Sequence, residues 1–199
     1  GDGRFNMENL PRDEMFCEVD SNGEPIKGTG FNLRRCFKGD LIISDYAQIE
    51  ARVLLYLVKD EEQLRMIREQ GISVYEAHAK KTMGWEGAGL KELGETDPVL
   101  NRLYRLAKAR VLGGGYGCGG SKFAATAWTM ARLRLTEEEG AAAVKEFRAD
   151  NPLIVRFWKT MDGILRRAVA AGRRCMEIKL PSGRTLYYWS PKQRTVKKI

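Results

Sequence analysis

The amino-acid sequence predicts an α+β fold that is mainly helical, with a small number of short antiparallel strands. Between residues 49 and 171, apolar residues recur at helical spacing or follow helix-capping residues over most of the chain. The short apolar run Leu41 to Asp45 predicts a buried strand, and Pro181 to Gly183 is a turn signal between two strand-like segments. With 199 residues and 43% hydrophobic content, the chain can form one sizeable core or two small subdomains.

Several helices have recognisable ends. Pro98 stands in the first turn of a long central helix, Thr136 and Glu139 have the spacing of a capping box, and Gly172 ends the last helix. The predicted helices are a segment beginning near Ile49 and residues 61–70, 73–83, 97–117, 121–133, 136–149 and 152–171. Outside the helices, we expect short strands and turns in residues 1–37, a glycine-rich loop at 84–95, and a hairpin formed by 174–180 and 184–189.

The charge of the chain favours a polyanionic partner. The net charge is +8 and the isoelectric point is about 9.4, and the segment from Arg184 to Ile199 has five cations and no acid. Nucleic acid is the first candidate, and a merely basic protein without such a partner is the alternative. The four cysteines are far apart and there is one histidine, so neither a zinc site nor a disulfide framework is predicted, and a reducing intracellular setting is expected. No segment resembles a membrane span or a signal peptide.

The stretch from Asp97 to Phe123 combines cations, glycines and an aromatic residue. Arg105, Lys108, Leu112 and Tyr116 have the spacing i, i+3, i+7, i+11, which predicts that all four share one face of a helix. Such a face suits a ligand that is anionic at one end and planar at the other. Gly119 to Lys122 has the wrong residue order for a phosphate-binding P-loop, and that reading is rejected. The three consecutive glycines Gly113 to Gly115 indicate a segment that is either not helical or able to bend.

A second candidate site is the segment from Asp45 to Glu50. It follows the predicted strand directly, and its two carboxylates and the amide of Gln48 could hold a hard cation and a sugar hydroxyl. The alternative is that Asp45 only caps the following helix, while Glu50 and Arg52 are solvated.

These segments carry a resemblance to the family A DNA polymerases, the bacterial DNA polymerase I type. Asp45 to Leu54 resembles motif A of that family, and Lys108 followed by Tyr116-Gly117 resembles motif B. Gly3 to Arg12 resembles the family's segment that meets the DNA minor groove, and Gly183-Arg184 with Tyr187 resembles a hairpin beyond the fingers. The four matches occur in the family's order along nearly the whole chain. Leu112 and Gly115 make the chain more similar to phage or prophage members.

The resemblance implies template-directed DNA synthesis by transfer of a deoxynucleotide to a primer 3′-hydroxyl. Residues 1–58 would be a partial palm with motif A. Residues 59–199 would be the fingers, with the nucleotide-binding helix at about 97–117 and the C-terminal hairpin. Asp45 would be the catalytic carboxylate, and with the carbonyl of Tyr46 it would hold two magnesium ions.

The resemblance also assigns binding residues. The implied nucleotide-binding residues are Gln48, Glu50, Tyr75, Arg105, Lys108, Leu112 and Tyr116. Lys108 would contact the phosphates, Glu50 would exclude a 2′-hydroxyl, and Tyr116 would stack near the templating position. The implied DNA-binding residues are Arg4, Asn9, Arg12, Gly117 and Arg184. Tyr104 stands where the family has an arginine, so the phosphate role passes to Arg105, and Tyr75 stands in place of a histidine.

One feature of the family is missing from the sequence. The second metal-binding Asp, in the H-D-E hairpin of motif C, has no counterpart before Ile199. We therefore expect a palm-and-fingers piece that is inactive alone and that needs the remainder of the polymerase, with motif C and the thumb. Its expected partners are primer-template DNA and a deoxynucleoside triphosphate, in the cytoplasm of a bacterial or phage-infected cell. Two alternatives stay open: a non-enzymatic, basic DNA-binding module and a relative of single-subunit RNA polymerases.

Overall fold

The computed structural model describes residues 18, 20–21, 26, 36, 39–40 and 45–192. The chain divides into two compact units, Gly1–Tyr46 and Ala47–Ile199, and the fold described below is that of the second. Most of residues 1–37, and the residues of the predicted buried strand before Asp45, lie outside the described part. The proposed boundary between palm and fingers at residue 58 stays a prediction.

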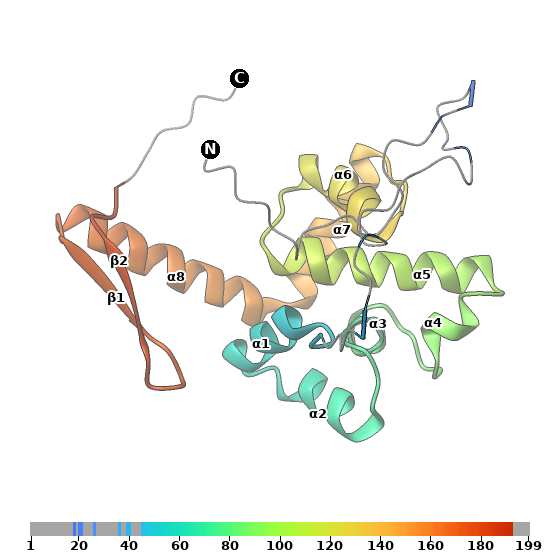
Figure 1. The fold of residues 1–199 in the computed structure, drawn as a ribbon, viewed down its shortest axis with the longest axis horizontal. Coiled ribbons are helices and arrows are strands. Elements are labelled where there is room, and N and C mark those ends of the chain that lie inside the picture. Colours follow the sequence, from blue (N-terminus) through green and yellow to red (C-terminus); the bar gives the residue numbers. More distant parts are fainter. Residues whose placement is uncertain are drawn as a thin grey trace. The chain divides into compact units, whose positions relative to one another are not determined.

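The described part of the second unit is mainly helical with one small antiparallel sheet, as the sequence predicts (Figure 1). Its elements are α1 (Ile49–Val58), α2 (Glu61–Gln70), α3 (Val74–Thr82), α4 (Leu90–Leu93), α5 (Pro98–Ala109), the π-helix η3 (Arg110–Gly114), α6 (Gly120–Ala131), α7 (Glu137–Asp150), α8 (Pro152–Ala170), β1 (Cys175–Lys179) and β2 (Thr185–Trp189). None of the helices within residues 45–192 has both the length and the apolar character that a membrane crossing requires.

Local sequence signals place most helix ends. The side chain of Asp97 accepts hydrogen bonds from the backbone N–H groups of Val99 and Leu100 and so caps α5. The predicted capping box is present, because Thr136 and Glu139 bond each other's backbone N–H groups at the start of α7. The expected loop at 84–95 is wrong in part, because it contains the single helical turn α4. Leu90 of that turn is fully buried, and this packing outweighs the surrounding glycines.

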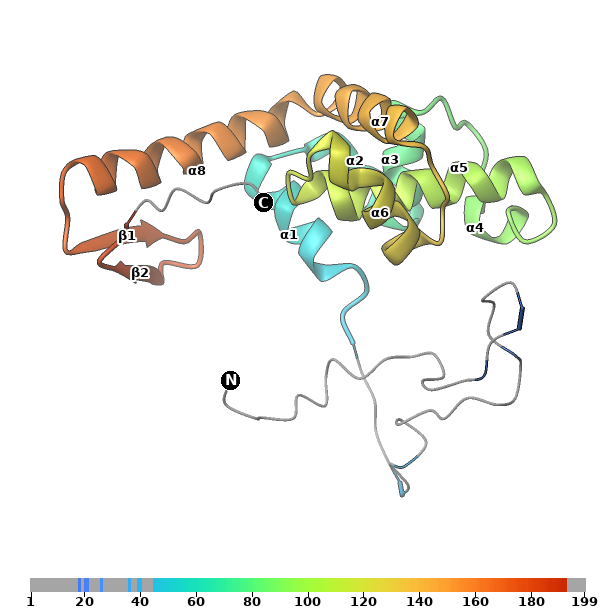
Figure 2. The same ribbon diagram turned by 90° about the horizontal axis from the view of Figure 1, so that it is seen from above.

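Helix α5 is the centre of the packing. Its Ala109 faces a core cluster shared with α6 and α7 that contains Phe123 and Val144. Its Ala107 belongs to a second cluster with Tyr75 of α3 and Leu90 of α4. A third cluster joins α1, α2 and α3. Figure 2 shows α3, α4, α6 and α7 arranged around α5. Helix α5 thereby packs against helices from both halves of the unit.

The central helix has the predicted extent but a different geometry. After Ala109 the backbone winds as a π-helix through Gly114, and the N–H of Cys118 still donates to the carbonyl of Gly113, five residues back. A π-turn contains more residues than an α-turn, so side chains beyond it leave the face that an α-helical count predicts. Arg105, which precedes the π-turn, bonds to the end of α6, whereas Leu112 and Tyr116, within and beyond the turn, line a cavity beside α1, so the predicted common face does not bring Arg105 to this cavity.

Glycines allow the π-helix to lie close to its neighbours. A Cβ on Gly114 would come within 2.8 Å of the Phe147 ring of α7, and one on Gly113 would meet the Phe123 ring at 3.1 Å. Side chains at these positions would require the rings to move. Gly113 and Gly114 are thus explained by close packing against these rings.

The C-terminal hairpin follows α8, beside whose final turns it lies in both views (Figures 1 and 2). Its strands pair in the register Cys175 with Trp189, Glu177 with Tyr187, and Lys179 with Thr185. Gly183, with a φ of 82°, supplies the left-handed backbone of the turn. The predicted hairpin is therefore confirmed, with slightly shorter strands than expected.

Candidate functional site

An apolar cavity lies between α1, the end of the π-helix and α8. Its volume is about 560 Å³. The side chains that line it come mainly from three places: Ile49, Glu50, Val53 and Leu54 of α1, Val111, Leu112 and Tyr116 of the central segment, and Phe157 and Trp158 of α8. Three of the predicted nucleotide-binding residues, Glu50, Leu112 and Tyr116, therefore meet at one cavity. Phe157 and Trp158 were not predicted for the site, and no motif in the sequence indicates them.

A hydrogen bond joins two of these residues across 66 positions of sequence. The hydroxyl of Tyr116 donates to the Glu50 carboxylate, which brings the end of the π-helix to the first turn of α1. This hydrogen bond is the main reason that the pKa of Tyr116 is raised to about 12, so the phenol stays protonated as a donor at neutral pH. The ring of Tyr116 is 65% exposed, and its face is accessible to a planar ligand.

Gln48 has a partner within the protein. It precedes α1 with a left-handed backbone, φ 56°, and its side-chain Oε1 accepts a hydrogen bond of 2.8 Å from the N–H of Val74, the first residue of α3. The amide therefore holds the start of α1 against the start of α3. Because Gln48 is the residue that precedes α1, the alternative in which Asp45 caps this helix is wrong. A contact of Gln48 with nucleotide stays a prediction.

The cations of the central helix lie in two different settings. Arg105 Nη1 donates to the backbone carbonyl of Arg132, 2.8 Å away, at the end of α6. Lys108 is half-buried in the last turn of α5. Arg105 thus fastens α5 to α6, and its predicted phosphate contact would require that bond to be exchanged.

Two tyrosines occupy positions where the resemblance suggested other residues. Tyr75 is buried, and its ring meets that of Tyr104 edge to face, with the centroids 6.0 Å apart. Burial raises the pKa of both phenols. Tyr104 therefore packs against Tyr75 in the core between α3 and α5, and this pairing explains how the chain accommodates a tyrosine in place of an arginine.

The predicted DNA-binding residues are spread along the chain. Gly117 follows the cavity with a φ of 74°, a conformation that favours glycine, and Arg184 is exposed at the turn of the hairpin. Arg4, Asn9 and Arg12 lie outside the described residues. Asp45 and Tyr46 are exposed and belong to neither a helix nor a strand.

Magnesium is the cofactor that the resemblance implies. The Asp45 carboxylate and the Tyr46 carbonyl are oxygen donors of the kind that Mg²⁺ prefers, so these two residues suit the ion. A two-ion site needs further carboxylates. No group of three or more His, Cys, Asp or Glu side chains within the described part of the chain is placed to hold a metal ion. Asp45 and Tyr46 would thus supply one part of such a site.

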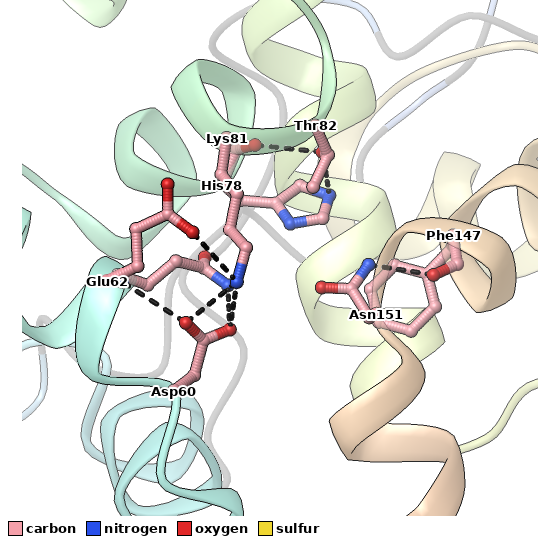
Figure 3. Close-up of polar contacts among 8 residues, drawn as sticks. Asp60, Glu62, His78, Lys81, Thr82, Phe147 and Asn151 are labelled. Carbon is pink, nitrogen blue, oxygen red and sulfur yellow. Dashed lines mark hydrogen bonds and ion pairs between the residues drawn. The ribbon is translucent and has the colours of Figure 1, made fainter.

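A buried polar network between α2, α3 and α7 was not predicted as a unit (Figure 3). Asp60 accepts hydrogen bonds from Gln63 and from Lys81, whose Nζ is 2.7 Å from Oδ2. His78 lies between this pair and Phe147, with ring centroids of His78 and Phe147 5.6 Å apart. The only sequence signal for this network was the capping position of Asp60 before α2.

Arg110 opens the π-helix as a buried cation. Its Nη2 lies 3.1 Å from Glu146 and 3.4 Å from Asp150 of α7, and its Nε has no hydrogen-bond partner. These two ion pairs tie the start of the π-helix to α7, the helix whose Phe147 ring lies against Gly114.

Sequence comparison supplies a relative. No protein-family model matches the chain. A protein named DNA polymerase from Bacillus phage SP02 is 26% identical over 167 residues, which is 77% of this chain and 24% of that protein. The chain thus spans about a quarter of the length of this relative. The chain is therefore similar in sequence to a phage DNA polymerase.

Proposed function

We propose that this chain is the fingers and part of the palm of a DNA polymerase of the bacterial DNA polymerase I type. It would bind a deoxynucleoside triphosphate and primer-template DNA for transfer of the nucleotide to a primer 3′-hydroxyl. The observation that carries the proposal is the hydrogen bond from Tyr116 to Glu50, because it joins the two segments that resemble motifs B and A at one cavity. The similarity to a phage DNA polymerase supports the same assignment.

Each residue of the proposed site has a task that suits its chemistry. Lys108 would contact the triphosphate, for which an ammonium group is a mobile point charge. Glu50, held by the Tyr116 hydroxyl, would occupy the space that a ribose 2′-hydroxyl needs and so select deoxynucleotides. The exposed Tyr116 ring offers its face to a base. Arg184 and the basic N-terminal segment would contact DNA phosphates, which makes binding strongly dependent on salt.

The remainder of the polymerase would complete the metal site. Bound magnesium would activate the primer hydroxyl and neutralise the triphosphate, with Asp45 and the Tyr46 carbonyl among its ligands. Because this chain supplies one of the two expected carboxylates, we expect little primer extension from it alone. The palm would cover residues 1–58 and the fingers residues 59–199, and the polymerase would act in the cytoplasm of a bacterial or phage-infected cell.

Titration of the chain with a fluorescent dATP analogue tests the nucleotide site. Lys108→Ala should weaken binding by at least tenfold, because one charge-assisted contact is lost. Lys145→Ala, on the exposed side of α7, is the matched control and should bind as the wild type does. Equal affinity of the Lys108→Ala and wild-type chains would refute the site.

The same titration distinguishes the proposed polymerase function from its main alternative. A non-enzymatic, basic DNA-binding module derived from the polymerase fold would bind DNA but show no Lys108-dependent affinity for dATP. In the complete polymerase, Asp45→Ala should abolish primer extension, and retained extension would remove Asp45 from the metal site. Robust extension by the 199-residue chain alone would contradict its dependence on further carboxylates.

A further inference from the structure

The outward face of the C-terminal hairpin has two stacked aromatic rings. Tyr187 and Trp189 alternate along β2 with Tyr188 between them, so both side chains stand on the same face. Their ring centroids are 6.4 Å apart and the ring planes differ by 20°. Tyr187 is 56% exposed and Trp189 is 75% exposed. A large exposed aromatic pair on a two-stranded sheet therefore needs an explanation other than packing.

The opposite face of the hairpin already supplies the packing. Met176 of β1 is paired with Tyr188 and is almost fully buried, and β1 is the strand that contacts α8. In an antiparallel sheet with one packed face, the other face is normally polar. Here the aromatic residues lie on the face that does not carry Met176, so the core of the unit does not require them.

The surroundings of the two rings are strongly basic. Between Gly172 and Lys192 the five cations are all exposed, and the single acid is Glu177, opposite Tyr187. The cations are Arg173, Arg174, Lys179, Arg184 and Lys192. Within residues 45–192 none of these five side chains is in an ion pair. Their charge is therefore available to an anionic partner.

A polar cavity adjoins the hairpin on the side of α8. Its volume is about 640 Å³, and Arg167 and Arg173 contribute to its wall together with Cys175 and Glu177 of β1. Cys175 and Glu177 are the cross-strand neighbours of Trp189 and Tyr187. Two guanidinium groups thus line a space beside β1 that is large enough for a phosphate.

We propose that the hairpin is a platform for single-stranded DNA, with successive bases stacked on Tyr187 and Trp189 and the phosphates near the surrounding cations. Aromatic rings in a basic groove are the usual means by which proteins hold single strands without reading their sequence. A duplex does not offer the faces of its bases, and five cations beside a single acid suit the phosphates of a nucleic acid strand. The choice of DNA rests on the proposed polymerase function, whereas the stacking platform rests on the hairpin alone.

Fluorescence anisotropy of a labelled dT12 oligonucleotide with the 199-residue chain tests the platform, without nucleotide or magnesium. Tyr187→Ala and Trp189→Ala should each weaken binding by roughly tenfold. Trp189→Phe keeps a ring and should stay within about threefold of the wild type. Tyr56→Ala removes another exposed aromatic ring, on α1, and should have no effect. Circular dichroism of each variant confirms that the fold is kept.

Three further oligonucleotides decide what is recognised. An abasic strand with the same number of phosphates should bind at least tenfold more weakly than dT12. A 12-base-pair duplex that contains the dT12 strand should also bind at least tenfold more weakly. Equal binding of the abasic strand, or equal loss in Tyr56→Ala, would overturn the stacking platform. Tighter binding of rU12 than of dT12 would overturn the assignment to DNA. The measurement uses neither a Lys108 variant nor a deoxynucleoside triphosphate, so a failed dATP titration does not decide this test.

Discussion

Asp60 shows how a single carboxylate stays ionised inside this protein. Burial alone would raise its pKa, but the hydrogen bonds from Lys81 and Gln63 outweigh burial and hold the pKa below the usual 3.8 (Figure 3). The charged form is thus favoured in the folded chain. A lowered pKa in the folded state stabilises the protein at pH values above the unfolded pKa, and this stabilisation is lost as the pH falls through the folded pKa.

Lys81→Met should therefore destabilise the fold by about 3 kcal/mol, because it leaves the Asp60 carboxylate buried without its cation. Chemical denaturation at pH 7 measures the loss. Lys91→Met, at an exposed position of α4, is the control and should change the unfolding free energy by less than about 0.5 kcal/mol. A loss in Lys81→Met no larger than that of the control would show that the pair adds nothing to stability.

The hydrogen bond between Gln48 and Val74 gives a second prediction that concerns a single side chain. Removing its amide in Gln48→Ala leaves the N–H of Val74 without its acceptor, and we expect a loss of about 1 kcal/mol in unfolding free energy. Gln70→Ala, at the exposed end of α2, is the matched control and should cost little. If Gln48→Ala instead weakens dATP binding at unchanged stability, the amide serves the ligand rather than the fold.

Among the elements, the π-helix depends most on small residues. Gly114 lies against Phe147 so closely that Gly114→Ala must displace the ring, at a cost that exceeds the gain in helix propensity. We expect a net loss of about 1–2 kcal/mol in thermal or chemical unfolding. Gly115→Ala is the neighbouring control, because its Cβ would meet Leu54 at an ordinary 3.4 Å and its backbone is right-handed helical. Unchanged stability of Gly114→Ala would show that α7 adapts to the added methyl group.

Helix positions followed from the sequence far better than the geometry inside the central helix. Caps at Asp97 and Thr136 are local signals, read from side chains within three residues of the helix start. The π-turn depends instead on Gly114 meeting Phe147, a residue 33 positions away, and on the ion pairs of Arg110 with α7. No local pattern records such contacts. An α-helical count across the glycines could therefore not relate the position of Tyr116 to that of Arg105.

The candidate site was likewise predictable from local motifs but not in its long-range contacts. Glu50, Leu112 and Tyr116 were predicted one by one from motifs, and the structure brings them to one cavity. The hydrogen bond between Glu50 and Tyr116 spans 66 residues, so only the fold could reveal it. Phe157 and Trp158 of α8 complete the cavity. In the sequence, these two residues look like ordinary packing residues of a helix.

Between pH 6.5 and pH 5, the stability of the whole molecule depends on the single histidine in the chain. His78 is almost fully buried, and burial, helped by the charges of Arg110 and Lys81 and opposed by Asp60, lowers its pKa to about 3. The Thr82 hydroxyl donates to the His78 carbonyl, so the contact between Thr82 Oγ1 and Nε2 requires a proton on Nε2. The neutral ring is therefore the form that fits the folded protein.

His78 titrates normally, near pH 6.5, once the chain unfolds. Below that pH the unfolded state binds one more proton than the folded state, so the unfolding free energy falls as the pH drops from 6.5 towards 3. The slope is about 1.4 kcal/mol per pH unit, which gives a loss of about 2 kcal/mol by pH 5. Urea unfolding from pH 7.5 to pH 5 measures it, in a range where carboxylates of ordinary pKa hardly titrate. His78→Gln keeps a polar side chain but cannot take up the proton, so its stability should be nearly independent of pH over this range. An equal slope in both proteins would mean that the acid sensitivity arises outside the network of His78.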